Sequence, residues 1–101
     1  MIIPVEVERD DMGYWTHPSL ARSGCETAAE LGHWLRLHRL TCFVMTMRDE
    51  DTEAFAAGFT DEAPDARGWK LTPPPGKGGF LGSVHDTDNG PVCYWLRQIA
   101  A

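Results

Sequence analysis

The strongest constraint on the fold lies near the C-terminal end, where two apolar segments flank a short turn. Residues 80–85 and 91–97 are rich in aromatic, aliphatic and β-branched side chains, which favour strands. Between them, Asp86-Thr87-Asp88-Asn89-Gly90 contains an Asn-Gly pair, and these two residue types readily adopt positive φ in turns. The pattern predicts a β-hairpin.

The pairing of this hairpin decides which side chains share a face. If His85 pairs with Pro91, the core face holds Phe80, Gly82, Val84, Val92, Tyr94 and Leu96, and the other face holds Leu81, Ser83, His85, Cys93, Trp95 and Arg97. Gly82 would then lie opposite Tyr94, whose ring covers the glycine backbone. A shift of one residue would exchange the two faces.

A second hairpin is predicted at the N-terminal end. Ile3, Val5 and Val7 alternate with polar residues or proline, which is typical of a strand with one face in water. Pro4 predicts an edge position, because proline donates no backbone hydrogen bond. Turn residues follow at 9–13, and residues 14–17 predict a short returning strand.

The middle of the chain predicts a helix followed by a strand. Residues 26–39 carry apolar side chains at three- and four-residue spacing, with acidic residues early and basic residues late, as an amphipathic helix favours. Residues 40–47 are apolar at alternating and consecutive positions, which predicts a central strand covered on both faces. Residues 52–59 predict one or two helical turns.

Residues 61–79 contain four prolines and four glycines, which excludes a regular helix or strand and predicts a long loop with Trp69 as its anchor. Together the segments predict a single α+β domain over residues 1–101: a small antiparallel sheet of about four or five strands with one main amphipathic helix. A chain of 101 residues is long enough to bury a core without metals or disulfides.

The net charge of −6 comes from one segment. Residues 49–65 hold seven acidic side chains and neither Lys nor Arg, so nine basic and eight acidic residues elsewhere leave +1. The acidic residues are Asp49, Glu50, Asp51, Glu53, Asp61, Glu62 and Asp65. Because phosphate contacts depend on Lys and Arg, direct nucleic-acid binding is not expected, and an acidic surface favours a basic protein partner.

Metal sites and cofactors are not predicted. Cys25, Cys42 and Cys93 form no C-x-x-C pair, which argues against a disulfide framework or structural zinc. His33 and His38 do not share a helix face, and the turn at 86–90 lacks the later ligands of a calcium loop. No apolar run is long enough to span a bilayer, so we expect no membrane association and a cytoplasmic location in a host cell.

The C-terminal run Gly79-Phe80-Leu81-Gly82-Ser83-Val84-His85-Asp86-Thr87-Asp88-Asn89-Gly90-Pro91-Val92-Cys93-Tyr94-Trp95-Leu96-Arg97 resembles a segment of small uncharacterised proteins encoded by bacteriophages and prophages. Residues 3–10 and 15–18 are similar to the start of the same group, so the resemblance covers about a third of the chain. It implies a phage origin and an accessory role in the infected host, and it implies no reaction.

Three functional hypotheses remain open. The first is a non-enzymatic accessory protein that binds a host or defence-system protein, most concretely an anti-CRISPR inhibitor, through the acidic residues of 49–65 with Trp69 and Trp95 as anchors. The second is a small hydrolase or metal-dependent enzyme centred on His85 and Asp86. The third is a homo-oligomeric structural module, such as a homodimer formed by the hairpin face.

Overall fold

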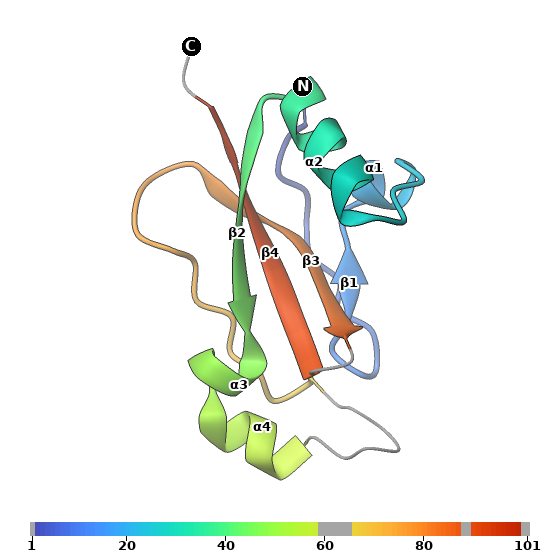
Figure 1. The fold of residues 1–101 in the computed structure, drawn as a ribbon. Helices are drawn as coiled ribbons and strands as arrows, with labels where there is room; N and C mark the ends of the chain where they lie inside the picture. The colour runs from blue at the N-terminus through green and yellow to red at the C-terminus, as the bar shows by residue number, and fades with distance from the viewer. Residues whose placement is uncertain (1, 59–65, 88–89, 100–101) are drawn as a thin grey trace.

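The computed structural model describes residues 2–58, 66–87 and 90–99. It contains a four-stranded antiparallel sheet in the order β1-β3-β4-β2, and helices along one face and at one end (Figure 1). The strands are β1 (Trp15–Thr16), β2 (Leu40–Thr46), β3 (Gly79–Thr87) and β4 (Gly90–Gln98), and the helices are α1 (Pro18–Ala21), α2 (Ala28–Leu37), α3 (Met47–Glu50) and α4 (Thr52–Gly58). The predicted α+β class is confirmed.

The predicted C-terminal hairpin is present, and its register is confirmed for Phe80 opposite Leu96 and Leu81 opposite Trp95, but from Ser83 onward it differs by one residue. Asp86 rather than His85 pairs with Pro91, and the register shifts between Leu81 and Ser83. Gly82 lies at this bulge, where a Cβ would come within 2.8 Å of the Leu96 side chain. Ser83 therefore takes the position opposite Tyr94 that the sequence pattern assigned to Gly82, and Ser83 and His85 share a sheet face with Tyr94.

Apolar side chains pack on both faces of the sheet, and among the described residues they form two apolar cores. The α2-side core contains Ile2, Trp34, Leu40, Phe80 and Leu96. The α3-side core contains Met47, Ala66, Trp69, Leu81, Val84 and Cys93. The hairpin supplies residues to both cores, which explains why most of its side chains are buried.

Helix α2 begins at a capping box that the sequence carries locally. Thr27 accepts a hydrogen bond from the backbone N–H of Glu30, and the Glu30 carboxylate accepts one from the backbone N–H of Thr27. These bonds satisfy backbone donors that a helix start leaves unpaired. Trp34 is buried beneath the helix, whereas Leu37 lies outside the apolar stripe and is exposed.

Strand β2 was expected at the centre of the sheet, and this prediction is wrong. It pairs with β4 on one side and is the last strand in the sheet order. Phe43 and Val44 are therefore 52% and 54% exposed. An apolar run predicts a strand, but the order of strands is decided by long-range pairing that the run does not encode.

The predicted N-terminal hairpin is also wrong in its first half. Residues 2–10 contain no strand, and the short strand β1 pairs with Ser83 and Val84 of β3 instead. The segment is held by side chains: Arg9 donates hydrogen bonds to the carbonyl oxygens of Gly13 (2.8 Å), Trp69 (2.9 Å) and Ala66. Because residues 2–10 join no strand, Ile3, Val5 and Val7 are exposed.

Residues 66–78 form no helix or strand, as predicted for this part of the long loop. The backbone N–H of Ala66 donates to the carbonyl of Met12, and Gly13 packs directly on Ala66. Further along, Arg97 donates to the carbonyl of Pro75. These contacts fold the loop over the α3-side face of the sheet. None of the helices in the described ranges is long and apolar enough to cross a membrane.

Candidate functional site

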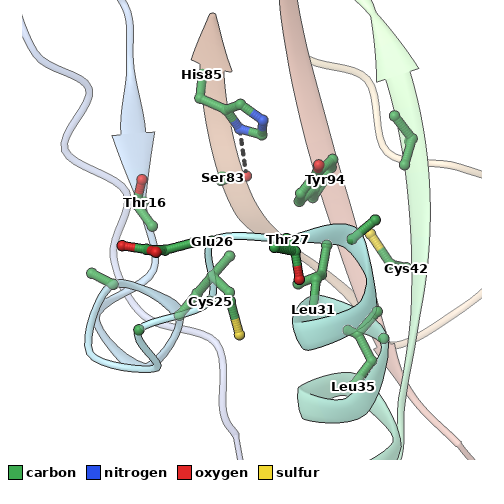
Figure 2. A pocket seen from close by; sticks show the side chains of 16 residues that line it. Thr16, Cys25, Glu26, Thr27, Leu31, Leu35, Cys42, Ser83, His85 and Tyr94 are labelled. Carbon is green, nitrogen blue, oxygen red and sulfur yellow. Dashed lines mark hydrogen bonds between the residues drawn. The ribbon is translucent and has the colours of Figure 1, made fainter. Parts of the chain in front are cut away.

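A groove of about 670 Å³ opens between the sheet and the segment that connects α1 to α2 (Figure 2). Its apolar wall includes Leu20, Leu31, Leu35, Cys42 and Val44. Its polar groups come from different elements: Thr16 from β1, Glu26 and Thr27 from the start of α2, Ser83 and His85 from β3, and Tyr94 from β4. All four strands and the N-terminus of α2 thus contribute to one space.

The central polar contact of this groove joins two residues of β3. Ser83 Oγ lies 3.0 Å from His85 Nδ1 (Figure 2). Residues two apart on a strand point to the same face, and the bulge at Gly82 makes this face the groove face. Ser83 and Cys93, which the predicted register placed on one face, lie on opposite faces, because Cys93 pairs with Val84 and belongs to the α3-side core.

Burial disfavours the charged forms of three groove side chains, His85, Tyr94 and Cys42. Desolvation lowers the pKa of His85, and the nearby charge of Asp86 opposes this shift. Burial also raises the pKa of Tyr94, and it raises the pKa of the Cys42 thiol to about 11. The ring of Tyr94 stands edge-on to His85, with 4.8 Å between the centroids.

The chemistry available at this contact is that of a hydroxyl beside a neutral imidazole. A neutral imidazole can accept the hydroxyl proton during nucleophilic attack. Asp86 follows His85 on the strand and is exposed, so its side chain projects from the other face and does not orient the imidazole. Ser83 is only 2% exposed, which restricts access to its oxygen.

Helices α3 and α4, which carry the described acidic residues of 49–65, lie at the opposite end of the sheet from α2 (Figure 1). Asp49 and Glu50 lie in α3, Asp51 ends that helix, and Glu53 lies in the first turn of α4. Asp49, Glu50 and Glu53 are exposed, whereas half-buried Asp51 accepts a hydrogen bond from the backbone N–H of Lys70 (3.3 Å). We call these four residues the acidic corner; the other predicted members, Asp61, Glu62 and Asp65, lie outside the described residues.

The two predicted aromatic anchors differ in their placement. Trp69 is 2% exposed and packs inside the α3-side core, so it anchors the loop to the sheet and offers no exposed surface to a partner. Trp95 is half-buried against the same core. Both side chains were expected to contact a partner, but the loop of residues 66–78 folds over the α3-side face, where both of them pack. The exposure of Phe43 and Val44 was not predicted, because an apolar run does not distinguish an edge strand from a central one.

The histidines do not gather. His17 is buried at the start of α1, where Nε2 lies 2.7 Å from the carbonyl oxygen of Ile3 and Nδ1 accepts from the backbone N–H of Ser19. His38 packs on Trp34 at the end of α2. Across residues 2–58, 66–87 and 90–99, no three His, Cys, Asp or Glu side chains are grouped to hold a metal ion.

Comparison of the chain with protein-family models, with curated proteins and with solved structures found no match. The resemblance to phage-encoded proteins stays a prediction.

Proposed function

We propose that this protein is a non-enzymatic accessory protein that binds a basic surface of another protein through its acidic corner. The observation that carries the proposal is the exposure of Asp49, Glu50 and Glu53 on two consecutive short helices. Three further acidic residues follow in the chain at 61–65. A cluster of one sign of charge increases the rate of encounter with an oppositely charged partner and suppresses binding to acidic ones.

The kind of partner follows from this charge. A basic channel that normally holds nucleic acid presents the complementary surface, and an acidic domain placed there would compete with phosphates. The resemblance to phage-encoded proteins makes a host or defence-system nuclease the most concrete candidate, and an anti-CRISPR inhibitor the most concrete version of the proposal.

A matched pair of variants tests the role of the acidic corner. Asp49→Lys/Glu53→Lys and Glu8→Lys/Asp11→Lys change the net charge equally, and all four residues are exposed. We expect a partner recovered from bacterial host lysate by the wild-type chain at low salt to be lost with the first variant and retained with the second. It should also be released at high salt, because screening weakens exposed charge pairs. Equal recovery with both variants would refute the proposal.

One observation favours a second candidate function, a small hydrolase. The Ser83–His85 hydrogen bond lies in the groove. In the reaction, Ser83 Oγ would attack an ester carbonyl carbon while its proton passes to His85 Nδ1. The alcohol would leave with that proton, and water would then hydrolyse the acyl-serine. This candidate requires hydrolysis of a small ester such as p-nitrophenyl acetate that is faster than in Ser83→Ala; equal rates contradict it.

A further inference from the structure

Strand β2 ends the sheet with an unpaired edge. Its residues Leu40–Thr46 pair with β4 on one side, and no other strand in the described part of the chain joins its second side. The backbone N–H of Ile99 donates to the carbonyl of Arg39 (2.8 Å), so Arg39 and Ile99 form a hydrogen-bonded pair. Hydrogen-bonded and non-hydrogen-bonded pairs alternate along an antiparallel ladder. By this alternation the backbone groups of Leu40, Cys42, Val44 and Thr46 point away from β4.

This edge is unusual because its exposed side chains are apolar. Phe43 and Val44 lie on opposite faces of the strand and are both more than half exposed. Protein edge strands are commonly protected from further pairing by charged side chains, proline or bulges. Strand β2 contains no charged residue and no proline, and its pairing with β4 is continuous over seven residues.

We infer that a second copy of this chain covers the edge, by antiparallel pairing of β2 with β2 about a two-fold axis at Phe43. This axis gives the longest overlap: Cys42 lies opposite Val44 of the second copy, and Leu40 lies opposite its Thr46. The outward N–H and C=O groups of these residues then meet in hydrogen-bonded pairs. The two Phe43 side chains become direct neighbours on one face.

Charge complementarity argues for a second copy over an unrelated strand. The exposed basic residues Arg36 and Arg39 lie where β2 begins, and the acidic corner lies where it ends. Two basic residues also lie at the acidic end: Arg48 places its guanidinium over the Phe55 ring, and the backbone N–H of Lys70 donates to Asp51. The four residues of the acidic corner outnumber them. Antiparallel pairing brings the basic end of each copy beside the acidic end of the other, twice in one dimer.

Disulfide trapping tests the axis. Phe43 and its symmetry mate form a non-hydrogen-bonded pair with Cα atoms about 4.5 Å apart, within reach of a disulfide. In Phe43→Cys, oxidation with diamide should therefore give a covalent dimer. Thr41→Cys is the matched control, because it is exposed on the same strand face but would lie about 14 Å from its symmetry mate, four residues along the ladder. Equal dimer yields from Phe43→Cys, Thr41→Cys and the wild-type chain would overturn the proposed register.

Sedimentation equilibrium tests the dimer without a new cysteine. We expect the wild-type mass to rise from 11.2 kDa toward twice that value as concentration increases, and high salt to weaken association. Val44→Pro removes an outward N–H and leaves the β4 ladder intact, so it should remain monomeric while Val44→Thr still dimerises. The inference is refuted if the wild-type chain stays monomeric at every concentration. It is also refuted if Val44→Pro dimerises as strongly as the wild-type chain.

Discussion

Gly13 illustrates what a single residue contributes, because it joins two segments that are distant in sequence. Its φ is +87°, and a Cβ there would lie 2.5 Å from the carbonyl carbon of Ala66. Gly13→Ala combines backbone strain with a collision against main chain, so we expect the free energy of unfolding to fall by about 2–4 kcal/mol. Gly24→Ala is the control: φ is +73° with nothing within 4 Å, and about 1–2 kcal/mol should be lost. Equal losses in urea unfolding would contradict the collision.

His85 gives the groove a predictable pH dependence. Its pKa is lowered in the folded state by desolvation, so below the ordinary value of 6.5 the unfolded chain binds more protons than the folded one. Stability is therefore expected to decrease as pH falls through this range and to be unaffected by His85 above it. Thermal unfolding from pH 7.5 to 5 should show a smaller decrease in Tm for His85→Gln than for wild type. Parallel curves for the two proteins would show that His85 contributes nothing.

At the scale of elements, the start of α2 depends on a reciprocal pair of hydrogen bonds between Thr27 and Glu30. Thr27→Ala removes the acceptor for the N–H of Glu30 and should lower the free energy of unfolding by about 1 kcal/mol. Thr27→Ser keeps that acceptor and should lose much less. The measurement is urea unfolding followed by circular dichroism. If both variants lose the same stability, the threonine methyl group rather than the cap would be the important contact.

For the whole molecule, the two cores share the hairpin and should unfold together. Trp69 belongs to the α3-side core and Trp34 to the α2-side core, while β3 and β4 contribute to both. We expect Trp69→Ala to cost about 3–5 kcal/mol and to lower the urea midpoint of the entire domain. In the wild-type chain, tryptophan fluorescence and far-UV circular dichroism should give coincident transitions. Two separate transitions would show that the cores unfold independently.

The sequence by itself determined the features that depend on near neighbours. The apolar spacing of residues 28–37 and the turn chemistry around Gly90 predicted α2 and the C-terminal hairpin, because helix periodicity and turn conformation are local properties. The order of the predicted helices and strands also indicated the α+β class, and the positions of the charged residues showed the acidic segment. The acidic corner's partner remains a prediction.

Only the tertiary structure decided which strand lies at an edge and which face the β3 residues beyond Gly82 occupy. The bulge at Gly82 placed Ser83 and His85 beside Tyr94, and the loop over the sheet buried Trp69. A period of two predicts alternation along a strand, but strand order and bulges arise from packing between distant segments. The groove and the free edge of β2 are therefore products of long-range contacts.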